Sequence, residues 1–329
     1  MPLVAASDYR PPALLRDGHS STLFATLSRR LPALPYQRQR LDLHDGDFLD
    51  IDWSRVGSRR LVVVSHGLEG NSGRPYVVGM VRAFNRAGWD AAAWNFRGCS
   101  GELNRTLTFT HSGASGDLAS VVAAACATGR YDAVALVGFS LGGNLTLKYL
   151  GELGDDVPSA VRAAVVFSVP CDLEGSASRM GDRANWVYMR RFLAELRGRI
   201  EAKAAQFPGK VSLEGFARIR TFRQFDERYT APLHGFGGAL DYWTRSSSKA
   251  FVGGIRRPTL LVNAMDDPFL VASCFPREEA VRSEWLHLEA PEAGGHVGFV
   301  TIGNDGEYWS ETRAVGFAGQ HAGPPGNFP

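Results

Sequence analysis

Residues 133–150 read AVALVGFSLGGNLTLKYL and form the most informative segment of the chain. The apolar run over residues 133–139 predicts a strand that is buried on both faces, and the residues from Asn144 onward predict a helix. Between them, Gly138-Phe139-Ser140-Leu141-Gly142 matches the pattern G-x-S-x-G, which places a serine on a tight, strained strand-to-helix turn. Glycine is needed two residues before and after Ser140 because side chains there would collide. A glycine-rich turn without catalytic function is the alternative interpretation.

Further apolar runs on both sides of this segment predict a sheet of buried strands. The runs that predict strands span residues 61–64, 90–95, 163–169, 259–263 and 285–288, and helical patterns span residues 76–86, 117–128 and 144–153. Strands that alternate with helices in this way predict a mostly parallel sheet with helices on both faces. Arg38 to Ser54 alternates polar and apolar residues around Asp45-Gly46, which predicts a β-hairpin.

The region from residue 171 to residue 250 breaks this alternation. It contains no buried apolar run, but it has an Arg-rich helical pattern over residues 185–205 and an irregular segment rich in Phe and Tyr. We therefore expect an α/β core formed by residues 1–170 and 251–318, with residues 171–250 inserted as a helical cap. The N-terminal region before the hairpin is expected to be irregular because its prolines interrupt any long helix. Residues 319–329, which contain Pro-Pro-Gly, are expected to be a disordered tail.

Composition and charge exclude several classes of protein. Of the 329 residues, 44% are apolar and 21% are charged, which excludes a disordered chain. The 36 Lys and Arg nearly balance the 34 Asp and Glu, so no nucleic-acid partner is expected. Residues 179–223 are a local exception with 11 basic and 4 acidic residues. The helix there is either a solvated face or a site of transient contact with an anionic membrane surface, and its arginines are Arg190, Arg191, Arg197 and Arg199.

The sequence has no pattern typical of a membrane span, a leader peptide, a metal site or a cofactor site. No apolar run approaches the ~18 residues of a transmembrane helix, and the first ten residues lack the pattern of a signal peptide. The four cysteines form no CxxC pair, so we expect reduced thiols and a cytoplasmic location. The sequence also lacks a glycine-rich phosphate loop, an HExxH motif and a Cys/His cluster, so we expect neither a nucleotide cofactor nor a metal.

A nucleophilic serine needs a base, and the base needs a carboxylate to orient it. When the serine lies on this kind of turn, the chain order is serine, acid, histidine. Three histidines follow the later strands, of which His287 falls inside a predicted strand and His321 inside the predicted disordered tail. His296, which follows two glycines just after the last strand, is therefore the candidate base, with a solvated loop histidine as the alternative.

Two adjacent aspartates, Asp266 and Asp267, follow the predicted strand at residues 259–263. A carboxylate just beyond the end of a parallel strand lies on the same edge of the sheet as the serine turn. Only one of the two can point toward His296. We favour Asp267 because Pro268 fixes the turn that aims its side chain, and Asp266 is kept as the alternative.

The developing oxyanion of an acyl transfer needs backbone N–H donors. Leu141, directly after Ser140, supplies one candidate donor. The other is expected in the loop after the first parallel strand, residues 65–71, whose glycines allow close approach to a substrate, and we assign it to Leu68. His66 in the same loop is interpreted as a buried brace rather than a second base, because it precedes the serine.

Taken together, these motifs resemble the α/β-hydrolase superfamily and, within it, the YheT-like family of predicted esterases. The segments that carry the resemblance are Tyr9-Arg10-Pro11-Pro12, Asp17-Gly18-His19, HGLEGN at residues 66–71, NFRGCSGE at residues 95–102, residues 138–143, Asp266-Asp267-Pro268-Phe269 and residues 294–299. The resemblance implies an α/β-hydrolase fold with a mostly parallel eight-stranded sheet, a helical cap between strands six and seven, and a triad of Ser140, Asp267 and His296. Similar proteins act on carboxylic esters, including acylglycerols and phospholipids. Asn71 departs from the small serine expected there.

The residues predict a cofactor-independent serine hydrolase that cleaves carboxylic esters of apolar acyl groups, or lipid-like substrates, through an acyl-enzyme. The alternatives are a thioesterase, a lactonase or a peptidase that uses the same triad, and a non-catalytic member that only binds a small molecule. The oligomeric state is left open. Aromatic residues of the cap line an acyl pocket or pack its core, and they are Trp186, Tyr188, Phe192, Phe222 and Phe225.

Overall fold

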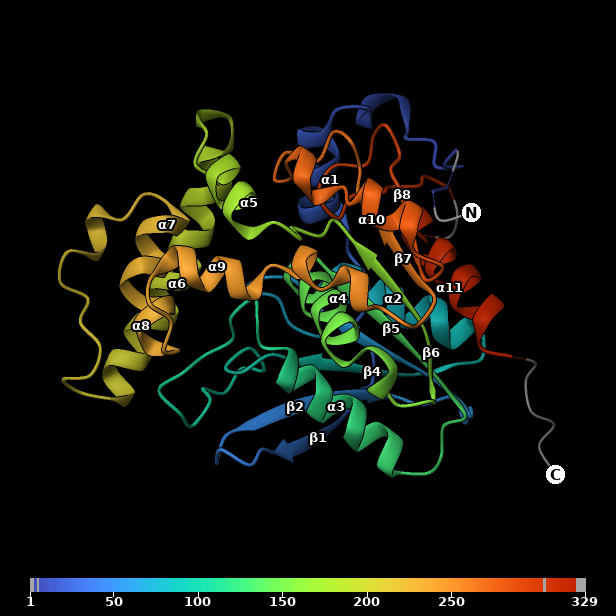
Figure 1. The fold of residues 1–329 in the computed structure, drawn as a ribbon, viewed down its shortest axis with the longest axis horizontal. Coiled ribbons are helices and arrows are strands. Elements are labelled where there is room, and N and C mark those ends of the chain that lie inside the picture. The colour runs from blue at the N-terminus through green and yellow to red at the C-terminus, as the bar shows by residue number, and fades with distance from the viewer. Residues whose placement is uncertain (1–2, 5, 304–305, 324–329) are drawn as a thin grey trace.

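The centre of the molecule is a single eight-stranded sheet (Figure 1). A computed structural model describes residues 3–4, 6–303 and 306–323. The strands are β1 (Gln37–Asp42), β2 (Phe48–Ser54), β3 (Arg60–Ser65), β4 (Asp90–Asn95), β5 (Ala133–Phe139), β6 (Val161–Phe167), β7 (Thr259–Val262) and β8 (Leu286–Glu289). Their order is β1-β2-β4-β3-β5-β6-β7-β8, in which β1 pairs antiparallel with β2, β2 pairs antiparallel with β4, and all later pairings are parallel. The predicted mostly parallel sheet and the hairpin at its edge are confirmed.

The strand register brings the carboxyl ends of the central strands to one edge of the sheet. Ser65 of β3 pairs with Gly138 of β5, and Phe139 of β5 pairs with Phe167 of β6. Phe167 pairs in turn with Val262, the last residue of β7. The loops that follow β3, β5, β6 and β7 therefore converge beside Ser140, which is where an open parallel sheet builds its binding sites.

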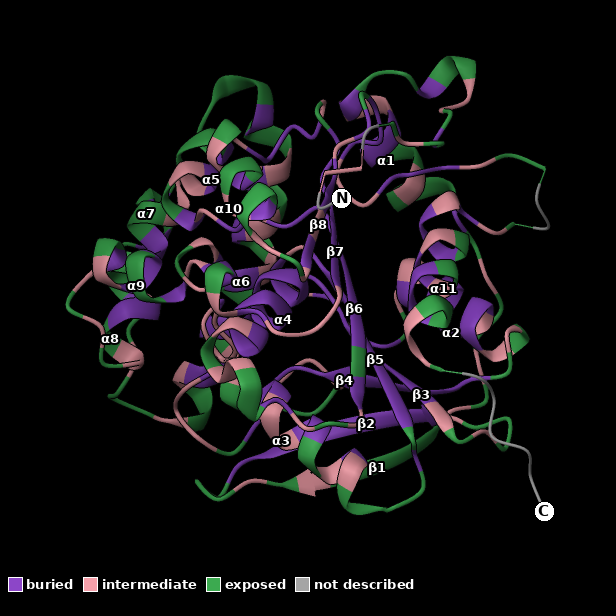
Figure 2. Cartoon of the chain, turned by 45° about the vertical axis from the view of Figure 1, so that its right-hand side comes forward, coloured by how far each residue is buried: buried purple, intermediate pink, exposed green. Residues whose placement is uncertain are grey.

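Helices cover both faces of the sheet because its central strands are apolar on both sides. Figure 2 shows α2 (Pro75–Arg86) and α11 (Trp309–His321) on one side of the strands, with α3 (Ser115–Ala127) and α4 (Leu141–Leu153) on the other. The pleat divides each strand between two cores. In β3, Leu61 and Val63 pack in the core under α3 and α4, whereas Val62 and Val64 pack in the core under α2 and α11.

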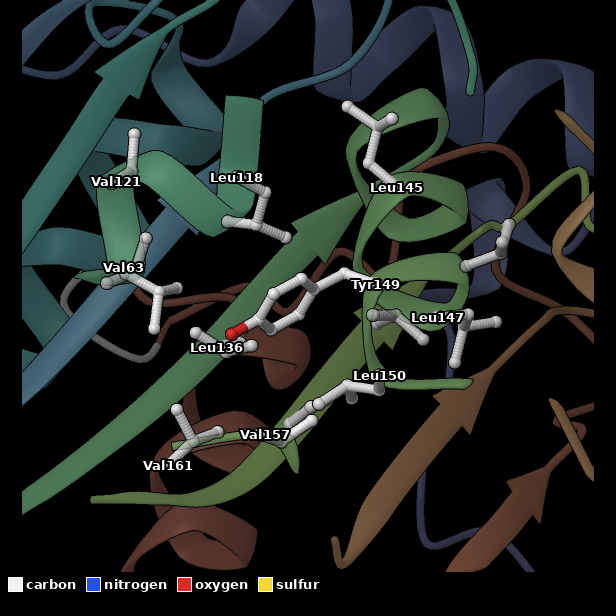
Figure 3. Packing of buried hydrophobic residues seen from close by; sticks show 14 of the residues in the cluster. Val63, Leu118, Val121, Leu136, Leu145, Leu147, Tyr149, Leu150, Val157 and Val161 are labelled. Atoms are coloured by element: carbon white, nitrogen blue, oxygen red, sulfur yellow. The ribbon is translucent and has the colours of Figure 1, made fainter. Parts of the chain in front are cut away.

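The helix that begins directly after Ser140 is anchored in the first of these cores. Figure 3 shows the ring of Tyr149 from α4 directed toward Leu136 of β5, with Leu118 of α3 beside them. These side chains are fully or almost fully buried. The turn at Ser140 is therefore fixed at both ends, by a central strand before it and by a buried helix after it.

The segment between β6 and β7 is helical and lies to the left of the sheet in Figure 1. It contains α5 (Leu173–Met180), α6 (Trp186–Gln206), α7 (Phe222–Phe225), a π-helical turn η5 (Asp226–Thr230), α8 (Ala231–Leu233) and α9 (Ala239–Ser246). A hydrophobic cluster stabilises this segment and joins it to Phe109 and Phe269 of the core, and its other buried members include Met189, Leu196, Ile200 and Phe225. No helix in the described part of the chain is both long and apolar enough to cross a bilayer.

Two predictions about the ends of the chain are wrong. Residues Gly18–Ser28 form a helix, α1, because Asp17 caps it by accepting a hydrogen bond from the Ser20 N–H, and the prolines lie outside it. Residues 319–321 are not a disordered tail but the last turn of α11, where the rings of Phe317 and His321 are in contact. The remainder of the predicted tail, from residue 324 to residue 329, lies outside the described residues.

Candidate active site

Ser140 occupies a strained turn between β5 and α4. Its backbone has φ 52° and ψ −117°, a combination that is rare for a residue with a side chain. A Cβ atom on Gly142 would lie 2.4 Å from the carbonyl oxygen of His66, and one on Gly138 would lie 2.5 Å from the carbonyl oxygen of Gly142. These contacts explain why the turn needs glycine at both positions, as the pattern predicts.

A continuous hydrogen-bond chain joins Ser140, His296 and Asp267. The Nε2 atom of His296 lies 2.9 Å from the Oγ of Ser140, and its Nδ1 lies 2.9 Å from Oδ2 of Asp267. The Asp267 side chain is completely buried, and its Oδ1 also accepts a hydrogen bond from the Phe269 N–H. A carboxylate at Nδ1 favours the tautomer in which Nδ1 carries the proton and Nε2 can accept one from Ser140.

Asp266 faces a different partner. Its Oδ1 accepts a hydrogen bond of 2.9 Å from the backbone N–H of Gly295, and burial raises the pKa of its carboxyl. Of the two adjacent aspartates, the structure therefore brings Asp267 to the imidazole and uses Asp266 to hold the loop that carries His296.

The loop around His296 is held by two elements far apart in the sequence. The His296 N–H donates to Oγ1 of Thr22 in α1, at 2.8 Å. The Val297 N–H donates to Oγ of Ser168, the residue that follows β6, also at 2.8 Å. Sequence reasoning missed the contribution of Thr22, because the N-terminal region was expected to be irregular.

Backbone strain is concentrated around this site. Five non-glycine residues in the described chain have φ values between 42° and 56°, and these are Glu69, Ser140, Ser168, Val297 and Phe299. One lies in the loop after β3, one is Ser140, one follows β6, and two flank Gly298 in the histidine loop. Residues in this region of φ are found where surrounding structure holds them in place, often at functional sites.

The two candidate oxyanion donors lie beside Ser140. Leu68 and Leu141 line the same cavity as Ser140 and His296. Within the described residues, neither backbone N–H donates to a protein acceptor. His66 braces this loop: its Nδ1 lies 2.7 Å from the Gly67 carbonyl oxygen, and its Nε2 accepts from the Phe96 N–H. Burial lowers the pKa of His66 to about 3, so the ring stays neutral.

A buried ion pair links the loop of Leu68 to α6. The carboxylate of Glu69 accepts two hydrogen bonds of 2.9 Å from the guanidinium of Arg199, which also donates to the carbonyl oxygen of Arg97. The side chains of Arg199 and Glu69 are only 7% and 13% exposed. The interpretation of Arg199 as part of a solvated basic face is therefore wrong, whereas Arg190, Arg191 and Arg197 are exposed.

A cavity of about 120 Å³ extends from Ser140 beneath the helices that follow β6. Its walls are mainly apolar and include Phe109, Met180, Leu196 and Phe269. Of the five aromatic residues expected in an acyl pocket, Phe192, Phe222 and Phe225 line this cavity. Trp186 does not, because it is 59% exposed, and Tyr188 instead hydrogen-bonds His19 of α1. Within the described residues, no group of three or more His, Cys, Asp or Glu could hold a metal ion.

Known proteins are similar to this chain in sequence or in fold. The family model of the alpha/beta hydrolase fold matches residues 60–300. The chain is 35% identical over 302 residues to the protein named Putative esterase YheT of Escherichia coli (strain K12), covering 90% of this chain and 88% of that one. It is 25% identical over 307 residues to human Phospholipase ABHD3, covering 90% and 75%. The Pyrococcus furiosus esterase Pf2001 superposes with a TM-score of 0.61 at 16% identity, covering 95% of this chain and 100% of that one, which shows a shared fold.

Proposed function

The chain belongs to the α/β-hydrolase fold family and, within it, to the YheT-like group, and from this premise we propose that it hydrolyses carboxylic esters of apolar acyl groups through Ser140, His296 and Asp267. The observation that carries the proposal is the hydrogen-bond chain from Ser140 Oγ through His296 to Asp267, at the mouth of an apolar cavity. The relatives named esterase and phospholipase support ester hydrolysis as the reaction class.

In the proposed reaction, Nε2 of His296 accepts the Oγ proton of Ser140 while Oγ attacks the ester carbonyl carbon. The N–H groups of Leu68 and Leu141 donate to the oxyanion. His296 then gives its proton to the departing alcohol oxygen, which leaves the acyl group on Ser140. A water molecule, deprotonated by His296, attacks this acyl carbon, and collapse of the second tetrahedral intermediate returns the proton to Oγ and releases the acid.

Two further assignments belong to this proposal. We propose that residues 171–250 act as the cap of the active site, since the helices from α5 to α9 supply most of the cavity wall. We also propose a cytoplasmic location, which the four free cysteine thiols support, and transient contact of the exposed arginines of α6 with an anionic membrane surface.

Covalent labelling with a fluorophosphonate probe tests the proposed nucleophile. We expect the wild-type protein to be labelled and Ser140→Ala to remain unlabelled, because the probe reacts with a serine that has an adjacent base. Ser120→Ala is a matched control, since Ser120 is a helix-surface residue whose hydroxyl bonds only to Gly116 within its own helix. Labelling is read by mass spectrometry, together with hydrolysis of p-nitrophenyl esters of graded acyl length.

Two outcomes of this experiment would contradict the proposal. Equal labelling of the wild type and Ser140→Ala would place the nucleophile elsewhere. A folded wild-type protein that is neither labelled nor active on any ester would favour the non-catalytic interpretation. Relative rates on oxygen esters and thioesters of one acyl chain distinguish an esterase from a thioesterase.

The ion pair between Arg199 and Glu69 leads to a second prediction. Replacing Arg199 by glutamine should lower kcat by about 10- to 100-fold, because it releases the loop that carries the Leu68 N–H. The expected loss is smaller than the roughly 10²- to 10³-fold loss in kcat that follows removal of a whole oxyanion donor, since the N–H is displaced and not removed. KM should change little. The affinity for a trifluoromethyl ketone, whose adduct mimics the oxyanion, should fall by the same factor as kcat/KM.

The control for this prediction lies on the same helix. Arg197 pairs with Glu201 on the surface of α6, where its side chain is 55% exposed, so Arg197→Gln should leave kcat within about twofold. If Arg199→Gln also has a wild-type kcat, the ion pair has no part in positioning the donor.

A further inference from the structure

The cavity next to Ser140 contains one carboxylate that the proposed reaction does not use. Asp226 belongs to the π-helical turn η5, lines the cavity and is 9% exposed. Its Oδ1 accepts a hydrogen bond of 2.6 Å from the Thr230 hydroxyl, and its Oδ2 accepts one of 2.9 Å from Nε1 of Trp243. Both donors are neutral. Although burial raises the pKa of Asp226 to about 6, the carboxyl is mostly ionised above neutral pH.

Among the buried acids of the described chain, Asp226 alone forms no ion pair. Eight others are buried, and each forms an ion pair with an arginine or, for Asp267, with His296. Those paired with arginine are Asp47, Asp50, Asp52, Asp90, Asp117, Glu289 and Glu311. No described Lys, Arg or His forms an ion pair with Asp226. His111 lines the same cavity but stays neutral, because burial lowers its pKa to about 3.

A buried carboxylate without a counter-charge is unfavourable. Removing an ionised carboxylate from water costs several kcal/mol unless a counter-charge or full hydrogen bonding offsets it. An asparagine could accept with its single oxygen from only one of the two donors, whereas each carboxylate oxygen of Asp226 accepts one hydrogen bond. The two hydrogen bonds come from neutral donors, so the charge of Asp226 has no counter-ion among the described residues, and Asp226 lines the cavity that a positively charged ligand could enter.

The rings around Asp226 suit one kind of cation. Phe222, Phe225, Tyr242 and Trp243 line the same cavity as Asp226, and Nε1 of Trp243 donates to its carboxylate. Aromatic faces attract cations through their quadrupole, and quaternary ammonium groups are typically bound by clusters of such rings. A hydrated metal ion is a poor match, because the cavity offers few oxygen ligands.

From this charge and these rings, we propose that Asp226 and its aromatic neighbours form a subsite for an ammonium group on the ester substrate. The inference rests on the proposed function, since it assigns a substrate class to the same site: esters whose alcohol or acyl part carries a positively charged nitrogen. Asp226 and the rings would bind this group while the ester carbonyl lies at Ser140.

The test compares pairs of esters that differ only in charge. Choline butyrate and 3,3-dimethylbutyl butyrate have nearly the same shape, because a tert-butyl group replaces trimethylammonium. A second pair carries the same two groups at the end of the acyl chain of a p-nitrophenyl ester. The charge ratio is kcat/KM for the cationic ester divided by kcat/KM for its neutral partner. For at least one pair, we expect a charge ratio of about 10 or more in the wild type, and we expect Asp226→Asn to lower this ratio by at least 10-fold.

Asp241→Asn is the matched control, because Asp241 lies on the exposed side of α9 with a side chain that is 41% exposed. It should leave the charge ratio unchanged. The ratio cancels any general loss of activity in Asp226→Asn, and circular dichroism checks the fold of each variant. The proposal would be overturned if the wild type did not prefer the cationic ester in either pair, or if folded Asp226→Asn had the same charge ratio as the wild type.

A binding measurement separates this proposal from the proposed function. The dissociation constant of Ser140→Ala for phenyltrimethylammonium is measured by calorimetry, and that for the neutral tert-butylbenzene by a fluorescence displacement assay. The cation should bind at least 10-fold more tightly than the neutral compound, whether or not the protein hydrolyses any ester. If the protein fails as an esterase but binds the cation selectively, the proposed function is wrong and the subsite stands. If it hydrolyses neutral esters and shows no selectivity for the cation, the subsite is wrong and the proposed function stands.

Discussion

Replacing Asp267 by asparagine is expected to lower kcat by about 10⁴-fold with little effect on folding. The amide can donate to Nδ1 of His296, which would favour the tautomer that places the proton on Nε2, facing Ser140, where it blocks general-base catalysis. Steady-state hydrolysis of a p-nitrophenyl ester measures the loss, and thermal unfolding checks that the variant is folded.

The neighbouring residue provides a control that differs by one position. Asparagine at position 266 keeps an oxygen that can accept from the Gly295 N–H, so Asp266→Asn should lower kcat by less than about 10-fold. A larger loss in Asp266→Asn than in Asp267→Asn would transfer the role of the triad acid to Asp266, the alternative that the sequence leaves open.

Replacing Gly142 by alanine is expected to destabilise the protein by about 3 kcal/mol and to abolish most activity. The added Cβ would lie 2.4 Å from the His66 carbonyl oxygen and 2.5 Å from that of Ser65, and neither backbone atom can move without displacing β3 and the oxyanion loop. Urea unfolding measures the change in the free energy of unfolding.

Gly198 serves as the matched control for this substitution. A Cβ there meets no heavy atom within 4 Å, and the residue lies inside α6, so alanine should stabilise the protein by roughly 0.5–1 kcal/mol. If Gly142→Ala is as stable as the wild type, the close packing of the turn against β3 is wrong.

The sheet was predictable because its signals are local. Each buried parallel strand is a short apolar run, and for β4 and β5 the predicted bounds are those of the structure. The prediction for β6 was displaced by two residues toward the C-terminus: the strand begins at Val161 and ends at Phe167, because Ser168 has φ 53° and does not continue it. The missed helix α1 did have a local signal, since Asp17 is a favoured N-cap residue.

The site was predictable only where motifs and chain order define it. The pattern around Ser140 and the position of His296 after the last strand sufficed to choose residues that the structure places within hydrogen-bond distance. The contacts of Thr22 with His296 and of Arg199 with Glu69 span 274 and 130 residues. No local pattern encodes such pairs. That no described cation forms an ion pair with Asp226 likewise became visible only once the positions of the described arginines were known.

The five non-glycine residues with positive φ around the site limit how far the thermal stability of this protein can be raised without loss of activity. Each disfavours the folded state by about 1 kcal/mol or more, and glycine at any of them would relieve that penalty. A mutant library sorted by melting temperature alone would therefore enrich changes at these positions, which hold the nucleophile, the oxyanion loop and the histidine loop in shape. Directed evolution of heat resistance in this protein therefore has to measure turnover in the same round. Otherwise the selected substitutions will raise the melting temperature by relaxing the backbone that positions the active site.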